Sequence, residues 1–383
     1  MTDKKELLKI SLFKTTALIP LCLSLAVCAG YPSLFGFVTA LIAAVLLNIA
    51  PETRLYPVLF VFLILNYIGA DYGDNGVMIC LAAGILISVL FLAIKPLRER
   101  IASFGAFGAL SLITALFITV IVTNIYFGIG AHGDTIYRML RSYRSLGFHP
   151  NWRGILYGTV VMVVMITFPR KFKKLTRIVS GMFFALVITY FLNLLLVPSG
   201  AVRTFAEVGA PVWKPAYSFV NLQGDLVDLR RFAVDAVISG IALGFVIACA
   251  AAGNIKDKKS TAAVYSSAVL SSAFGIPAIF SGNSSKTDYC SGLISALITA
   301  AVMLPAMLFE RLPAASCAVI LIVSAWQNLE KKALKSEFKD PVIVIGLIVS
   351  SFASAFFNPG LVVIILALFS AFGKNKRSET VNP

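Results

Sequence analysis

The chain of 383 residues is long enough for two or three soluble domains, yet 58% of its residues are hydrophobic and only 13% are charged. This composition excludes a soluble protein and indicates a polytopic membrane protein, whose surroundings are the lipid bilayer. The net charge of +15 would suit a nucleic-acid-binding protein, but the basic residues stand in short clusters between apolar runs. The positive-inside rule produces that pattern, so we expect no nucleic-acid partner.

Hydropathy predicts fourteen membrane spans, several of them short. The first seven lie at about 17–30, 34–49, 57–69, 76–94, 103–128, 153–168 and 178–197. The second seven lie at about 231–253, 260–274, 284–291, 292–309, 313–326, 340–356 and 359–372. We therefore predict a cytoplasmic segment 1–14, a first repeat 15–197, an extracytoplasmic connector 198–230, a second repeat 231–373 and a cytoplasmic tail 374–383.

Charge supports this arrangement, because alternate loops should be basic if the spans are correct. Basic clusters that fall on one side occupy the N-terminus, 95–100, 170–177, 256–259, 331–339 and the C-terminus. Both termini are therefore predicted to be cytoplasmic, in a bacterial inner membrane. The opposite face is predicted to hold Asp71 and Asp74, the connector, and the turn at Asn358, Pro359 and Gly360.

One loop on that opposite face is basic. Arg138, Arg141 and Arg144 recur every three residues, with Arg153 further along, so the first three would share one face of a helix. Two interpretations stay open. The loop forms a vestibule that attracts anions, or an interfacial helix whose arginines contact lipid headgroups.

Two halves of seven spans predict an inverted repeat, since an odd number of spans reverses the orientation of the second copy. The third span follows Pro51 and Pro57 and is short, and the tenth follows Gly275 and Pro277 and is shorter still. Short, Pro/Gly-interrupted segments at corresponding positions are typical of transporter sites, where two half-helix N-termini meet near the bilayer midplane. Their positive dipole ends favour an anion.

Lys286 is the strongest single candidate, because a cation at membrane depth costs at least ~2.5 kcal/mol on insertion scales. It would add positive charge to the half-helix beginning at Ser284, unless it pairs with Asp288 or reaches the interface. Asp288 is either an interfacial carboxylate or a coupling residue. Asn283, Ser284 and Ser285 are predicted to cap the helix start while leaving N–H groups and hydroxyls for a ligand.

Two features of the eighth span are interpreted as structural. Asp235 opens this span next to Arg230 and Arg231, which indicates a salt bridge at the rim rather than a proton site. Gly240 and Gly244 form a Gly-x-x-x-Gly pair, which indicates close helix packing.

The sequence gives no sign of an enzyme, a metal site or a cofactor. Six cysteines lie in apolar segments without a CxxC pair, and the chain holds only two histidines. Asp225 and Asp228 have the DxxD spacing of magnesium-dependent prenyl transferases, but no second aspartate motif accompanies them. Hydrolase, metalloprotease and phosphate-loop motifs are missing from the sequence, so we predict no catalytic residues.

The run IPLCLSLAVCAGYPSLFGF from Ile19 to Phe37 resembles the first-span signature of the SulP (sulfate permease) family of anion transporters. There a Leu-Pro and an Ala-Gly-x-Pro-Pro precede a Phe-Gly-Leu-Tyr-like second span. The similarity continues through most of the chain, at the basic turn after the fourth span, Asn151-Trp152, Phe168-Pro169-Arg170, Leu312-Pro313-Ala314-Ala315 and Ala325-Trp326.

The resemblance implies core and gate domains in a seven-plus-seven inverted repeat, a homodimer, and an anion held between the N-termini of the third and tenth spans. Carried over by position, the residues around this anion would be Leu25, Tyr56, Pro57, Val58, Asn283, Ser284, Ser285 and Lys286. The chain departs from the family in a shorter tenth span. We also expect no STAS domain after the last span, and the eighth span taken as Ala236 to Ala252 holds no acidic residue.

We therefore predict a secondary transporter of a small inorganic anion of the sulfate, bicarbonate or chloride class, working by alternating access. One alternative is a nucleobase permease of the xanthine/uracil type, which normally uses carboxylates in the eighth and tenth spans. A second alternative is a membrane scaffold that does not transport.

Overall fold

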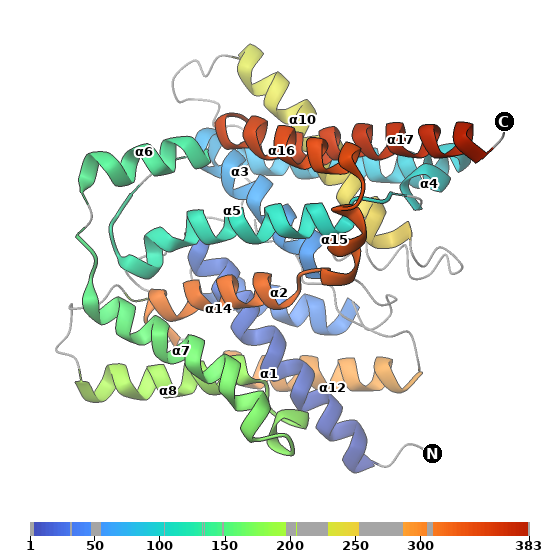
Figure 1. Ribbon diagram of the computed structural model, residues 1–383. Helices are drawn as coiled ribbons and strands as arrows, with labels where there is room; N and C mark the ends of the chain where they lie inside the picture. Colours follow the sequence, from blue (N-terminus) through green and yellow to red (C-terminus); the bar gives the residue numbers. More distant parts are fainter. Residues whose placement is uncertain are drawn as a thin grey trace.

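A computed structural model describes residues 4–30, 33–46, 55–102, 104–131, 133, 135–147, 149–196, 204, 229–252, 286–304 and 309–381. Within these ranges the chain is almost entirely helical (Figure 1), and the only extended pairing there is an isolated bridge between Thr204 and Pro313. The prediction of an all-helical membrane protein is confirmed. The ninth predicted span and the Asp225/Asp228 pair lie outside the described residues.

The helices are α1 (Lys4–Cys28), α2 (Ser33–Leu46), α3 (Leu55–Ala93), α4 (Lys95–Ala102), α5 (Phe107–Phe127), α6 (Ile136–Leu146), α7 (Trp152–Lys171), η1 (Leu175–Arg177), α8 (Gly181–Leu196), α10 (Leu229–Ala252), α12 (Lys286–Met303), α14 (Ala314–Gln327), α15 (Lys331–Glu337), α16 (Pro341–Phe356) and α17 (Leu361–Val381). Helix α1 thus begins within the segment predicted as 1–14, and α17 extends into the tail predicted as 374–383. The domain boundaries stay predictions.

Among the described residues, four helices are long and apolar enough to cross a bilayer, or up to six if each of two bent helix pairs forms one span. Five shorter apolar helices of 10–17 residues accompany them. The count of fourteen spans and the inverted repeat therefore stay predictions. One predicted boundary is visible inside α3, where Gly73 adopts φ 66° and ψ −167° between the third and fourth predicted spans.

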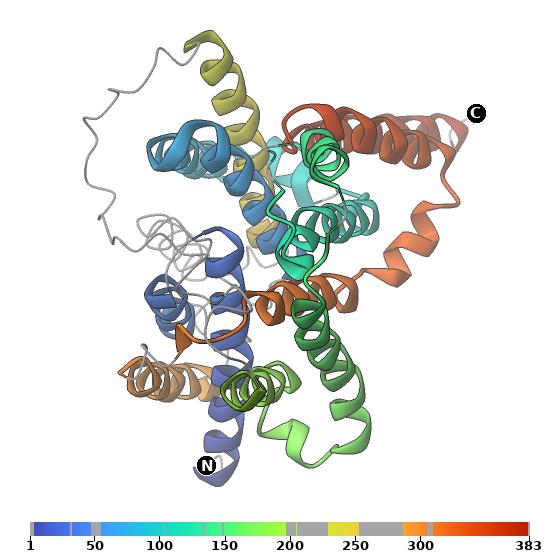
Figure 2. The ribbon, with the colours of Figure 1, turned by 90° about the vertical axis from the view of Figure 1, so that its left-hand side faces the viewer.

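Helices α3 and α10 pack closely against each other, as the Gly-x-x-x-Gly pair predicted. A Cβ atom on Gly244 would lie 2.6 Å from Ile87 Cγ2 and 3.0 Å from the carbonyl oxygen of Gly84. Only a glycine allows this approach of the two backbones. Figure 2 shows α3 (blue) and α10 (yellow) together, with α16 and α17 (red) beside them.

The tenth and eleventh predicted spans form one helix, α12, which continues through Ser291 and Gly292 to Met303. The prediction of a separate tenth half-helix ending at 291 is therefore wrong. Ser291 and Gly292 are buried, and Ser291 Oγ accepts a hydrogen bond from Lys14 Nζ of α1 at 3.0 Å. These small residues let α12 pack against α1, so they mark a helix contact rather than a helix end.

A buried carboxylate at the end of α15 caps α5. The backbone N–H groups of Gly108 and Ala109 donate to Glu337 Oε1 and Oε2 at 2.8 and 2.7 Å. Burial raises the pKa of the Glu337 carboxyl, while the two N–H donors act in the opposite direction. Glu337 therefore satisfies two amide groups that a helix start leaves without partners in the helix.

We expect Glu337→Ala to lower the free energy of unfolding by about 1–3 kcal/mol, because it leaves buried N–H groups without an acceptor. Glu337→Gln keeps one acceptor oxygen and should lose less. Thermal unfolding of the detergent-solubilised protein measures both changes. An alanine variant that melts with the unmodified protein would show that the cap contributes nothing.

Candidate functional site

The predicted site residues that the structure describes fall on three helices. Leu25 is fully buried in α1. Tyr56, Pro57 and Val58 lie in the first turn of α3, and the described part of α12 begins with Lys286, followed by Asp288. Asn283, Ser284 and Ser285 lie outside the described residues. Contact of all these residues with one ligand stays a prediction.

A cavity of about 370 Å³ opens between α1, α3, α5 and the segment that leads to α6. It is lined by Cys28, Asn66, Ala70, Asp71, Ile121, Asn124, Ile125, Ala131, Gly133 and Met139. Leu25 precedes Cys28 by three residues, so both lie on the same face of α1. The cavity thus opens beside the part of α1 that carries a predicted substrate residue, and its lining includes two amides and a carboxylate.

One wall of this cavity is held in place by Asn124. Its Nδ2 donates to the carbonyl oxygen of Ala131, and its Oδ1 accepts from the Ala131 N–H, both at 2.7 Å. This pairing reproduces a two-way backbone contact and fixes the segment after α5 against that helix. Gly128 permits the turn because it adopts a positive φ of 65° at the end of α5.

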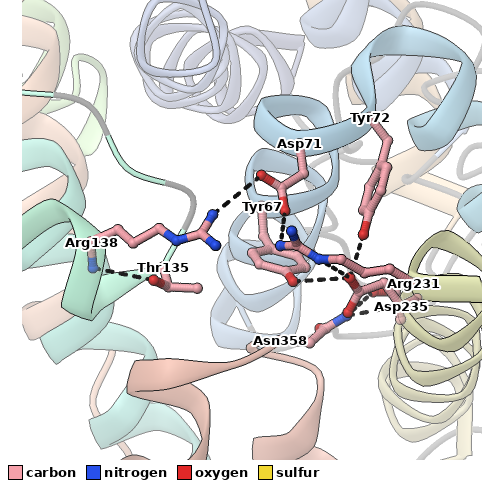
Figure 3. A network of polar contacts seen from close by, with 9 residues as sticks. Tyr67, Asp71, Tyr72, Thr135, Arg138, Arg231, Asp235 and Asn358 are labelled. Carbon is pink, nitrogen blue, oxygen red and sulfur yellow. Dashed lines mark hydrogen bonds and ion pairs between the residues drawn. The ribbon is translucent and has the colours of Figure 1, made fainter. Parts of the chain in front are cut away.

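Next to the cavity lies a network of polar contacts centred on Asp235 of α10 (Figure 3). Tyr72 and Tyr67 of α3 donate their hydroxyls to Asp235 Oδ2 at 2.6 and 3.1 Å. From the other side, Asn358 Nδ2 donates to Asp235 Oδ1 at 3.1 Å and to Ser239 Oγ at 2.8 Å. Asp235 is only 7% exposed and Asn358 only 1%. The carboxylate is therefore buried and surrounded by hydrogen-bond donors.

Asp71 of α3 extends this network to two arginines. Arg231 Nη2 donates to Asp71 Oδ2 at 2.8 Å, and Arg138 Nη1 of α6 lies 3.8 Å from Asp71 Oδ1 (Figure 3). Arg231 Nε also lies 4.0 Å from Asp235 Oδ2. Because Asp71 lines the cavity, the network and the cavity form one polar region at this end of the molecule.

The structure corrects the interpretation of Asp235. The salt bridge with Arg231 is present, but the tyrosine hydroxyls and the Asn358 amide are closer to the carboxylate. Since the described part of α10 begins at Leu229, Asp235 lies inside the helix, while the stretch from Ala236 to Ala252 holds no acidic residue, as stated from the sequence. The sequence signals for this network were the adjacent Arg231 and Asp235 and the placement of Asp71, Arg138 and Asn358 on one face of the membrane.

The basic loop that carries Arg138, Arg141 and Arg144 forms helix α6, as the interpretation of an interfacial helix required. Thr135 caps α6 by accepting a hydrogen bond from the Arg138 N–H at 3.2 Å. All three arginines are exposed, and Arg138 in addition reaches Asp71 of the network. The helix therefore presents all three arginines to its surroundings, and Arg138 also joins it to α3.

Solved structures share the fold of this chain, whereas no protein-family model and no curated protein matches it. The transmembrane domain of a cyanobacterium bicarbonate transporter, BicA, matches with a TM-score of 0.63 and 16% identity, over 96% of this chain and 97% of that chain. A structure of SLC26A9 matches with a TM-score of 0.62 and 14% identity, over 96% of this chain and 64% of that chain.

The murine SLC26A9 anion transporter in its inward-facing state matches with a TM-score of 0.62 and 13% identity, over 98% of this chain and 69% of that chain. At sequence identities of 13–16%, the similarity to these structures establishes the fold alone. The chain has the fold of the transmembrane domains of these anion transporters, in agreement with the resemblance seen in its sequence.

Proposed function

We propose that the protein is a secondary transporter of a small inorganic anion, of the sulfate, bicarbonate or chloride class, that works by alternating access. The observation that carries this proposal is the fold shared with the BicA transmembrane domain over 96% of the chain. A fold alone does not define a function, so the proposal also rests on the cation Lys286 within an apolar chain. We further propose a homodimer in the bacterial inner membrane, with both termini in the cytoplasm.

The substrate is proposed to lie between the first turn of α3, at Tyr56, Pro57 and Val58, and the start of α12. Leu25 would complete the pocket from α1. At the start of α12, Lys286 would supply a full positive charge beside Asn283, Ser284 and Ser285, with Asp288 as a coupling residue. A small anion suits this arrangement, because backbone N–H groups at helix starts and an ammonium group all favour negative charge.

A nucleobase permease is the second candidate, because α10 carries a buried carboxylate at Asp235. The hydrogen bonds of Asp235, however, favour the anion transporter. Tyr67, Tyr72 and Asn358 already surround Asp235, so a nucleobase would have to displace these donors.

Uptake by the purified protein in proteoliposomes tests the proposal. Labelled sulfate, bicarbonate, chloride and uracil are supplied separately, and protein-free liposomes give the background. We expect one of the anions to accumulate above background and its unlabelled form to compete with the label. Uptake of uracil alone would identify a nucleobase permease, and uptake of none would favour the scaffold.

A further inference from the structure

Two groups of helices meet at the Asp235 network. Helices α3 and α10 form one group and are joined by close backbone contact at Gly84 and Gly244. Helices α6, α16 and α17 form the other group around α5, and the two groups also pack against each other where α5 meets α3 and α17 meets α10. Stacking of Tyr137 on Phe356, with ring centroids 4.9 Å apart, ties α6 to α16 within this second group. Each group is therefore held together by packed apolar surfaces.

Polar contacts join the two groups at the end of the molecule that carries Asp71. Asn358 lies in the turn between α16 and α17, and its Nδ2 reaches Asp235 and Ser239 of α10. Arg138 of α6 reaches Asp71 of α3 across the same boundary. A polar contact that breaks regains hydrogen bonds from water, whereas an exposed apolar surface does not. These links are therefore suited to repeated breaking and re-forming.

The Asn358 link is preorganised from both sides. On its own side, the Gly360 N–H donates to Asn358 Oδ1 at 2.8 Å, which directs Nδ2 towards α10. On the opposite side, Tyr67 and Tyr72 occupy Asp235 Oδ2 and leave Oδ1 for the amide. Because each partner is held in position before contact, closure requires little further ordering of side chains.

We propose that the Asn358–Asp235 and Arg138–Asp71 contacts form a releasable latch that keeps the Asp71 side of the transporter closed. This proposal rests on the proposed function, because alternating access requires that side to open. Opening moves α3 and α10 away from α6, α16 and α17 and breaks both contacts. The positions of Asp71, Arg138 and Asn358 were all predicted for the extracytoplasmic face, so the latch closes the protein towards the outside.

Cys28 provides a built-in reporter of opening. It is 8% exposed, and it lines the same cavity as Asp71, beside the Arg138 link. The reporter protein keeps Cys28 and carries alanine at the other cysteine positions: Cys22, Cys80, Cys249, Cys290 and Cys317. A membrane-impermeant maleimide added from one side of oriented vesicles then measures how often the cavity opens to that side.

Asn358→Ala should raise the rate of Cys28 labelling from the Asp71 side by about tenfold, since a hydrogen bond to a charged group is worth about that factor. Arg138→Gln should raise this rate by about twofold, because its contact is longer and half-exposed. Asn328→Ala is the matched control, since Asn328 Nδ2 donates to the carbonyl oxygen of Ser324 in α14, and its labelling should stay unchanged. Unchanged labelling in folded Asn358→Ala and Arg138→Gln would overturn the latch.

Exchanging the carboxylate and the amide between positions 235 and 358 distinguishes loss of the latch from general destabilisation of the protein. Asp235→Asn alone should raise the labelling rate, whereas Asp235→Asn combined with Asn358→Asp keeps one carboxylate facing one amide and should restore slow labelling. Additive effects of the two changes would contradict the latch. The readout needs no substrate, so faster labelling in Asn358→Ala without any anion uptake would remove the proposed function and retain the latch.

Discussion

Lys286→Ala is expected to lower anion uptake at low substrate concentration by at least about thirtyfold. Truncating one member of a desolvated charge pair costs about 2–5 kcal/mol, and 2 kcal/mol corresponds to about thirtyfold. Lys286→Arg keeps the positive charge and should retain much of the uptake. Initial rates measured over a range of anion concentrations in proteoliposomes give the change in the ratio kcat/KM.

The control for Lys286→Ala is the same substitution at a lysine that lies away from the proposed pocket. Lys332 is exposed on α15, and Lys332→Ala should transport as the unmodified protein does. If Lys286→Ala and Lys332→Ala both transport normally, the anion binds elsewhere in the protein. If neither variant nor the unmodified protein transports, the scaffold interpretation gains support.

Much of the fold followed from composition and charge. An apolar chain must form helices or a closed barrel in a bilayer, and the long apolar runs predicted helices. The Gly-x-x-x-Gly pair predicted the close contact between α10 and α3, because only small residues allow two backbones to approach in this way. The alternation of basic loops placed Asp71 and Asn358 on one face, and both residues belong to the Asp235 network.

Hydropathy placed the start of the eighth span at residue 231, close to Leu229 where the described part of α10 begins, but it did not identify the partners of the charged residues there. From the sequence, Arg231 and Asp235 were interpreted as a salt bridge at the rim of the span. In the structure their charges are compensated by Asp71, Tyr67 and Tyr72, which come from α3, more than 150 residues earlier in the chain. Only the packing of α3 against α10 brings these groups together, and no local pattern encodes that contact.

The predicted break at residue 291 was wrong for a related reason. Ser291 and Gly292 are the residue types that end helices in water, yet they also permit helices to approach closely. Ser295 Oγ donates to the carbonyl oxygen of Ser11 at 3.0 Å, one turn beyond the contact between Lys14 and Ser291. Small polar residues therefore continue along the buried face of α12 and bind α1, which a sequence pattern does not distinguish from a helix boundary.

Gly244→Leu is expected to abolish recovery of folded, monodisperse protein, and Gly244→Ala to lower the free energy of unfolding by about 1–3 kcal/mol. Alanine normally stabilises a helix interior relative to glycine by about 1 kcal/mol. At Gly244 the new Cβ would lie 2.6 Å from Ile87 Cγ2, 2.8 Å from Ile87 Cβ and 3.0 Å from Gly84 O. Two of these atoms belong to or adjoin the backbone of α3, so the helices must separate and the clash outweighs the gain.

Gly69→Ala is the matched control, because it lies in the same helix pair and its new Cβ would meet only Val77 Cγ2 at an ordinary 3.4 Å. It should melt at or above the temperature of the unmodified protein. Ile87→Ala removes the Cγ2 contact but not the Cβ contact, so combined with Gly244→Ala it should recover part of the lost stability. Equal melting of Gly244→Ala and Gly69→Ala would mean that α3 and α10 do not pack at this distance, and the preorganised Asp235 network, which depends on that packing, would lose its basis.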